Sequence, residues 1–321
     1  LVGITNATGV TIANLTIRNV KWNGFKINSD QGAEKVTIYN CVIHNVWQRG
    51  VKAPAMPKAK GGQGPRECRI QYCLFYNDRS KQFADDETDT PDSFNGNYIG
   101  GIDVKNTINW TISDNVFIGI QGRTREGRGC IYISENGRGC RIERNIFIDC
   151  DIAIALGNPS LGYSPLQAIN CIVLNNFISQ CPETGILACY TRDCRIEKNT
   201  IHDPARSPRR PIWVQNSNDG LILRNNLLIG PPIQVTSNSV IEQVGNVHMD
   251  RIVNASSVES KAGQDFLAKK AIVQAVELPA RIQARKQQAA AGRLKPGIQP
   301  EGTLAAMRKV HEGFKGQRGY V

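Results

Sequence analysis

An aspartate and a lysine lie two residues apart in the segment GIDVK, residues 101–105. Successive side chains of a β-strand point to opposite faces, so Asp103 and Lys105 would share one face while Ile102 and Val104 share the other. A carboxylate and an amine exposed on one face can serve as acid and base in catalysis. They can also be members of surface ion pairs, each of which contributes about 0–1 kcal/mol. The elements that carry this segment therefore have to be identified first.

Internal repetition is the strongest signal in the sequence. Eight segments alternate apolar and polar residues, turn at their sixth position and then resume an apolar strand; they begin at residues 10, 36, 68, 110, 140, 171, 194 and 221. The sixth position is asparagine in the last five, at Asn115, Asn145, Asn176, Asn199 and Asn226. We expect these asparagines to tolerate the left-handed backbone of the bend and to bond to the equivalent amide one course above. The pattern predicts an all-β fold, a right-handed parallel β-helix.

A further strand recurs between these segments, so that each course has three strands and the chain has about nine courses. Its copies include GFKIN (24–28), GVKAP (50–54), GIDVK (101–105), CIYIS (130–134) and PIWVQ (211–215). Alternation would expose one column of side chains, namely Lys26, Lys52, Asp103, Tyr132, Ala155, Leu187 and Trp213. Adjacent courses lie about 4.8 Å apart, which would make Lys52, Asp103 and Tyr132 mutual neighbours. The small Ala155 beside them, with Gly157 in the parallel column, suggests a groove.

The turns that lead into this strand are rich in arginine. QGRTREGRG brings Arg123, Arg125 and Arg128 towards Tyr132, and DPARSPRRP brings Arg209 and Arg210 towards Trp213. Guanidinium groups pair with carboxylates through two parallel hydrogen bonds, and aromatic rings offer flat faces for a sugar. We expect the substrate-binding set to be Lys26, Arg123, Arg125, Trp213, Arg209 and Arg210, and the partner to be an acidic polysaccharide.

Over roughly residues 1–250 the chain resembles the right-handed parallel β-helix proteins of the pectate-lyase-like superfamily. The segment IDVKNTINWTISDNVF also resembles the alginate-lyase and chondroitinase-B family, with Lys105 at the position of the general base. Ser134 stands where that family presents an arginine, and the acidic calcium ligands expected before the lysine strand do not occur in NYIGGIDV. The resemblance implies a carbohydrate-active protein whose substrate lies along the outer face of the GIDVK strand.

The chemistry expected for an acidic polymer is β-elimination by a polysaccharide lyase. Lys105 or Lys52 would be the base, with a pKa lowered by a neighbouring cation. Arg128 would neutralise the uronate carboxylate, and Tyr132 would protonate the departing oxygen. Asp103 belongs to the same catalytic set.

Two alternatives stay open for this face. A glycoside hydrolase needs two or more carboxylates converging on one bond, and Asp103 is joined only by Glu135 and Asp151 at the following turns. A non-catalytic β-helix that binds glycan or forms a structural module needs neither. Nucleic acid is not an expected partner, because residues 1–250 carry only +3 of the net charge of +11 and their aromatic and basic residues are not interleaved.

The cofactor expectation is limited to calcium. Asp85, Asp86, Glu87 and Asp89 lie in the longest insertion, residues 76–100, and carboxylate oxygens are the ligands that calcium prefers. The four histidines fall in different units and make no zinc ligand set.

The repeat dissolves after Asp250, which predicts two domains: a β-helix at 1–250 and a basic helical tail at 251–321. The tail holds 13 Lys+Arg and 5 Asp+Glu, a net charge of +8. Residues 257–292, interrupted by Pro279, and residues 304–314 read as helices. The apolar positions Phe266, Leu267, Ile272, Val273 and Val276 would cap or clasp the open end of the stack.

The remaining expectations concern the cysteines and the setting. Cys68, Cys140, Cys171 and Cys194 open four repeat units, which favours buried, inward-facing thiols over disulfides or a metal site. No apolar run reaches the roughly 20 residues of a membrane span. We expect a monomer that is secreted or periplasmic, with its signal peptide absent from the given chain.

Overall fold

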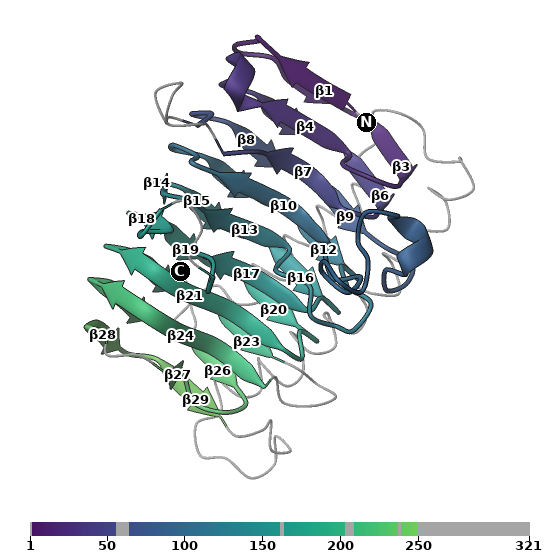
Figure 1. The fold of residues 1–321 in the computed structure, drawn as a ribbon. Helices are drawn as coiled ribbons and strands as arrows, with labels where there is room; N and C mark the ends of the chain where they lie inside the picture. Colours follow the sequence, from purple (N-terminus) through teal and green to yellow (C-terminus); the bar gives the residue numbers. More distant parts are fainter. Residues whose placement is uncertain (1, 56–63, 161–163, 203–208, 237–238, 250–321) are drawn as a thin grey trace.

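The structure, a computed structural model, describes residues 2–55, 64–160, 164–202, 209–236 and 239–249. These residues form three parallel sheets that the chain visits in turn, which makes a right-handed parallel β-helix (Figure 1). The predicted fold class is therefore confirmed. The predicted tail, residues 251–321, lies outside the described residues.

Sheet 1 carries the GIDVK strand and its stacked equivalents. Its strands are β1 (Val2–Thr5), β4 (Phe25–Asn28), β7 (Arg49–Ala53), β10 (Gly100–Lys105), β13 (Ile131–Ser134), β17 (Ile152–Leu156), β21 (Thr184–Arg192), β24 (Arg210–Asp219) and β27 (Gln234–Val235), with the short β14 (Gly137–Arg138) and β18 (Ala168–Ile169).

Sheets 2 and 3 hold the two halves of each repeat segment, before and after its bend. Sheet 2 consists of β2 (Thr11–Ala13), β5 (Thr37–Tyr39), β8 (Arg69–Gln71), β11 (Thr111–Ser113), β15 (Arg141–Glu143), β19 (Ile172–Leu174), β22 (Arg195–Glu197), β25 (Leu221–Arg224) and β28 (Ile241–Val244). Sheet 3 consists of β3 (Thr16–Val20), β6 (Val42–Val46), β9 (Leu74–Tyr76), β12 (Val116–Ile118), β16 (Ile146–Ile148), β20 (Phe177–Ser179), β23 (Thr200–His202), β26 (Leu227–Ile229) and β29 (Val247–Met249). The nine strands in each of these sheets match the predicted number of courses.

In the described part of the chain, two 3₁₀ helices, η1 (Ser29–Gln31) and η3 (Phe83–Asp85), interrupt the connections. Within the described residues no helix is long and apolar enough to cross a bilayer.

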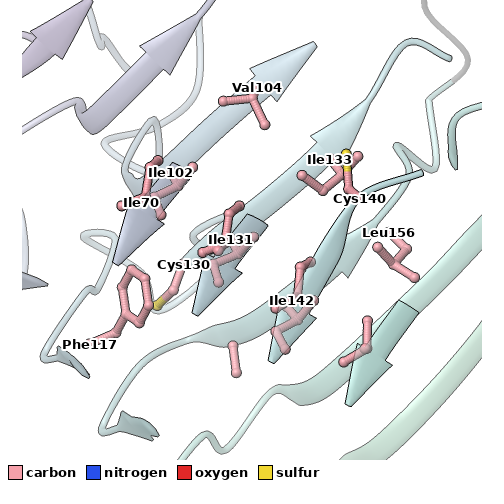
Figure 2. Packing of buried hydrophobic residues seen from close by; sticks show 14 of the residues in the cluster. Ile70, Ile102, Val104, Phe117, Cys130, Ile131, Ile133, Cys140, Ile142 and Leu156 are labelled. Carbon is pink, nitrogen blue, oxygen red and sulfur yellow. The ribbon is translucent and has the colours of Figure 1, made fainter. Parts of the chain in front are cut away.

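The interior of the coil is filled by alternate side chains of the strands in all three sheets, as alternation predicts. Ile102 and Val104 of β10 point inward, and the rings of Phe75, Phe117 and Phe147 stack with centroids 4.7 and 4.9 Å apart. Figure 2 shows this packing around Ile102, Phe117 and Ile131. The interior is therefore a dry, close-packed core that holds the strands in register.

The asparagine ladder forms as predicted and extends one course further. The side-chain amide of Asn115 donates to Asn145 Oδ1 at 3.0 Å and to the carbonyl of Ile70 at 2.9 Å, and the pattern continues up to Asn246. One detail of the prediction was wrong. The left-handed residue of each bend lies one position before the ladder asparagine, as at Asp114 (φ 59°) and Asn175 (φ 53°). The ladder residue is needed for its amide and the preceding residue for its backbone.

All ten cysteines are buried and free of disulfides, as the sequence favoured. The Sγ of Cys68 and of Cys194 each lie 3.4 Å from a backbone N–H of a neighbouring course. Burial raises the pKa of the Cys68 thiol to about 12, so it is neutral at physiological pH. These cysteines are structural.

Candidate functional site

The register of sheet 1 places the predicted column side by side. Lys52 of β7 pairs with Asp103 of β10, which pairs with Tyr132 of β13, and Lys26 of β4 pairs with Lys52. Because Ile102 and Val104 fill the interior, Asp103 lies on the outer face. Two glycines bring these strands close to the core: a Cβ at Gly50 would lie 2.7 Å from the Phe75 ring, and one at Gly101 would lie 2.6 Å from the Phe117 ring.

Asp103 lies on the outer face and is nevertheless buried. Its Oδ2 accepts hydrogen bonds from Lys52 Nζ at 2.6 Å and Arg49 Nε at 2.8 Å. Burial alone would raise the pKa of Asp103, but the charges of Lys52 and Arg49 outweigh it and lower that pKa to about 2. The carboxylate is therefore ionised throughout the physiological range and cannot act as a general acid.

Arg49 is the member of this cluster that the sequence analysis missed. It begins β7, directly after a turn, where the period of two no longer predicts the direction of a side chain. Its guanidinium lies 3.9 Å from the centroid of the Tyr98 ring, in the insertion before β10. The attraction between a cation and an aromatic face is stronger when the cation is desolvated.

The insertion 76–100 is anchored by a buried lysine. Lys81 is fully buried, and its ammonium donates to Asp86 at 2.9 Å, to Asp89 at 2.8 Å and to the carbonyl of Tyr98 at 2.9 Å. All three donors of the ammonium are thus used. The insertion is a specifically folded cover that holds Tyr98 against Arg49.

The four carboxylates predicted to bind calcium all have cationic partners. Asp86 and Asp89 bond to Lys81, Asp85 forms two hydrogen bonds of 2.6 and 2.7 Å with Arg79, and Glu87 lies 2.6 Å from Lys21. Among the described residues, no group of three or more His, Cys, Asp or Glu could hold a metal ion. The donor set does not fit calcium in this arrangement, and calcium binding here stays a prediction.

Two of the three arginines in the turn before β13 hold loops together. Arg123 Nε donates to the carbonyl of Asn95 at 3.0 Å, and its guanidinium lies 4.4 Å from the Phe83 ring centroid. Arg125 lies 3.1 Å from Asp149 and 3.2 Å from Asp151.

Asp151, directly before β17, anchors the same turn through backbone hydrogen bonds. Its Oδ2 accepts hydrogen bonds from the N–H groups of Gly122 at 2.7 Å and Gly127 at 2.8 Å. Burial raises the pKa of Asp151 to about 6, against the lowering effects of those N–H groups and of Arg125.

Arg128 differs from its two neighbours. Among the described residues it forms no ion pair, and its guanidinium lies 5.2 Å from the centroid of the half-exposed Phe94 ring. It is also close enough to Tyr132 to lower the pKa of that phenol, although burial dominates and the pKa of Tyr132 lies well above its usual value. Arg128 is therefore a charged group that lies beside the cluster and forms no ion pair with the described residues.

Two buried polar atoms of this face form no hydrogen bond within the described part of the chain. They are Asp103 Oδ1 and Ser134 Oγ, on the neighbouring strands β10 and β13. Buried polar atoms are almost always hydrogen-bonded in folded proteins, and exceptions concentrate at functional sites.

Lys105 lies in the second column, next to Ser134 of β13. Its Nζ is 3.7 Å from Glu135 Oε1, and its side chain is partly exposed. The charged neighbour of this lysine is therefore the carboxylate of Glu135, whereas a neighbouring cation was expected.

The groove predicted beside Ala155 does not exist in the form expected. Ala155 and Leu187, which alternation placed in solvent, are buried in a cluster with Tyr132 and Cys189 on the outer face. A Cβ added at Gly129 would lie 3.3 Å from Ala155 Cβ, so the arginine turn itself packs over this position. Gly157 is closed as well, because a Cβ there would lie 2.0 Å from the carbonyl oxygen of Cys189. The prediction failed because the alternation of a strand predicts which way a side chain points but not whether another segment of the chain covers it.

The second predicted subsite lies four strands further along sheet 1. The Arg210 guanidinium stacks 3.7 Å from the centroid of the half-exposed Trp213 ring and bonds to Glu183 at 2.6 Å. Arg209 is largely exposed and lies 3.5 Å from the same carboxylate. Leu187 lies between Trp213 and the Asp103 cluster in the register.

The geometry therefore separates two groups of predicted residues. The buried Asp103, Tyr132 and Arg49 form one cluster with Lys52, whose side chain is 14% exposed, whereas Lys26, Lys105 and Arg128 are partly exposed cations around it. The first group is positioned by mutual contacts, and the second can contact an anion.

A family model described as "Right handed beta helix region" matches residues 100–257. No curated protein matches the chain. Among solved structures, two of PfbA, a surface adhesin of Streptococcus pneumoniae, are 14% and 13% identical to this chain, with TM-scores of 0.44 and 0.47. They cover 78% and 77% of this chain, which spans 66% and 60% of their length. QnrB1, a plasmid-mediated fluoroquinolone resistance protein, is 11% identical with a TM-score of 0.18, covering 76% of this chain and 91% of its own.

The family model agrees with the β-helix fold, and none of the comparisons carries an argument about activity. Membership of the pectate-lyase-like superfamily and the similarity to alginate lyases stay predictions.

Proposed function

We propose that this protein binds an acidic polysaccharide on the outer face of sheet 1, along the partly exposed cations Lys26, Lys105 and Arg128. We call these three residues the cationic patch. They span the strands β4 to β13, about 14 Å at the usual strand spacing. An extended polymer with regularly spaced carboxylates or sulfates matches such a row better than a small anion does.

The observation that carries this proposal is the state of Arg128. Its guanidinium has no carboxylate partner among the described residues and lies against the half-exposed Phe94. A free guanidinium binds a carboxylate through two parallel hydrogen bonds, and the aromatic ring beside it offers a flat apolar surface for a sugar. Trp213, stacked with Arg210, provides a second aromatic contact on the same sheet.

Cleavage by β-elimination is the second candidate, and the buried hydroxyl of Tyr132 beside Arg128 favours it. Burial keeps this phenol protonated, as a proton donor to a departing oxygen requires. Arg128 would neutralise the uronate carboxylate and Lys105 would be the base. Lys52 is unsuited to that role, because its ammonium is bound 2.6 Å from the Asp103 carboxylate.

Hydrolysis through Asp103 has the least support. The pKa of about 2 leaves this carboxylate no proton to donate, and its Oδ2 is occupied by two cations. The secreted or periplasmic location predicted from the sequence fits an acidic polysaccharide partner and remains part of this proposal.

The test is a panel of acidic polysaccharides and a neutral one of similar length, measured for binding and for the ultraviolet absorbance of unsaturated sugar ends. We expect retention of an acidic polymer that weakens as salt increases, since salt screens exposed charges. Absorbance that depends on Lys105 would establish the lyase. Equal retention of the neutral polymer, or no retention at all, would contradict the proposal.

A further inference from the structure

The outer face of sheet 3 is apolar, in contrast to the outer face of an ordinary solvated sheet. In the three-residue strands from β9 to β26 the middle residue points into the core, as Phe117 does in β12, and the two flanking residues point outward. In β6 the core residue is Ile43, and Val42 and His44 flank it. Polar side chains interrupt this face at His44, Ser179, Thr200 and His202. Its apolar members are Val42, Leu74, Tyr76, Val116, Ile118, Ile146, Ile148, Phe177, Leu227 and Ile229.

These ten side chains are shielded from solvent although they lie outside the interior core. Their exposed fractions are 0–7%, from β6 to β26. At the two ends of the sheet the situation changes: Thr16 and Arg18 of β3 are exposed, and so is Val247 of β29. Seven consecutive strands of the nine are therefore covered, and the cover stops before either edge.

The described helices and strands provide no layer over this face. All described strands belong to the three sheets that form the sides of the coil, and the two 3₁₀ helices have three residues each. Uncovered, the face would measure roughly 30 Å by 10 Å, the size of the largest apolar patches that monomeric proteins expose.

The chain itself supplies an occupant in the right place. The described part ends at Met249 of β29, which is the last strand of sheet 3, and 72 residues follow. The first helix predicted there, residues 257–278, would be about 33 Å long, against about 29 Å for seven strands. Its apolar residues Phe266, Val273 and Val276 are seven and ten positions apart and would share one helical face.

We propose that the C-terminal segment, residues 250–321, folds back along the outer face of sheet 3, with the helix predicted at 257–278 packed on β6 to β26. This differs from a cap on the open end of the stack, which would leave the outer face of sheet 3 bare. The segment would thereby complete the fold and leave the outer face of sheet 1 available for polysaccharide.

Photo-crosslinking in the full-length chain tests the contact directly. A benzophenone amino acid replaces Phe266, and a matched control carries it at Gln264, on the opposite side of the predicted helix. We expect position 266 to crosslink within the same chain to peptides containing residues 116–118, 146–148 or 177–179, at least several times more than position 264. Crosslinks between two chains would instead assign the face to a second copy, and equal labelling from both positions would overturn the proposal.

Limited trypsin digestion provides an independent measurement, because Lys261, Lys269, Lys270 and Arg281 lie in or beside the predicted helix. Cleavage there should be at least tenfold faster in Phe266→Asp than in the wild type. Ile148→Asp on sheet 3 should have the same effect, whereas Ile172→Asp on the half-exposed face of sheet 2 should not. Since Phe266→Asp leaves the coil residues unchanged, it tests the contact even if Ile148→Asp fails to fold. Rapid cleavage of the wild type at these sites would refute the docking.

Discussion

The outer faces of sheets 1 and 2 both carry charged residues, but the two faces use them differently. On sheet 2 the arginines are half exposed and pair along the surface, as Arg141 does with Glu143 at 2.6 Å and Arg224 with Glu197 at 2.6 Å. On sheet 1, Asp103 and Arg49 are buried beneath the insertion 76–100, and the exposed cations of the cationic patch lie around them.

This difference indicates which charges are available to a ligand. Ion pairs at the solvated surface contribute little to stability, and their charges neutralise one another. The outer face of sheet 2 therefore resembles an ordinary solvated surface. A buried ion pair is costly to assemble and fixes its neighbours in place. On sheet 1 the buried pair positions the strand and the cover, while Arg128 stays without a carboxylate partner among the described residues.

The largest expected effect comes from breaking the buried pair. Asp103→Ala leaves the buried charge of Arg49 uncompensated and removes the partner of Lys52, which should lower the free energy of unfolding by about 3–5 kcal/mol. Glu143→Ala on sheet 2 should lower it by about 1 kcal/mol, because its arginine partners are solvated. Urea denaturation of both variants measures the difference. Equal losses would remove the distinction between the two faces.

A second effect is the dependence of stability on pH, which has opposite signs for Asp151, next to sheet 1, and for Glu143 on sheet 2. The pKa of Asp151, raised to about 6 mainly by burial, exceeds that of an unfolded aspartate, so its contribution is full at low pH and is lost as pH rises from about 4 to 6. The loss is about 3 kcal/mol at most. The carboxyl of Glu143 is buried in part, but Arg144 and Arg141 hold its pKa below the ordinary value, so its contribution is lost as pH falls.

Asp151→Asn should therefore remove the loss of stability between pH 4 and 6, while Glu143→Gln should flatten only the acid limb. Thermal unfolding of the two variants and the wild type over this pH range is the measurement. An Asp151→Asn curve parallel to the wild type would show that this carboxyl does not titrate in the folded protein as proposed.

The repetitive part of the molecule could be predicted from sequence because each course repeats the same local problem. Asn115 and Asn145 meet because each bend from Asn115 to Asn226 buries an asparagine side chain, and Cys68 is buried because its position in the repeat faces inward. The column from Lys26 to Tyr132 follows from the strand period alone.

The parts that could not be predicted are those in which the chain leaves the repeat. Arg49 and Tyr98 come into contact although one follows a turn and the other lies in an insertion. Lys81 neutralises Asp86 and Asp89, and the spacing of these carboxylates in the sequence does not show that a lysine lies between them. The strand period correctly predicted that Ala155 lies on the outer face. It did not predict that Ala155 is buried, because the turn before β13 packs over it.

Charge reversal on the two faces tests most directly the claim that the cationic patch binds an acidic polysaccharide. Lys105→Glu and Arg128→Glu on sheet 1 are compared with Arg195→Glu on the exposed face of sheet 2, which changes the net charge by the same amount. The account predicts that each change on sheet 1 weakens binding of the retained acidic polysaccharide at least tenfold, about 1.4 kcal/mol, while Arg195→Glu leaves it within twofold. Equal weakening by all three variants would show that only total charge matters, and would contradict a site on sheet 1.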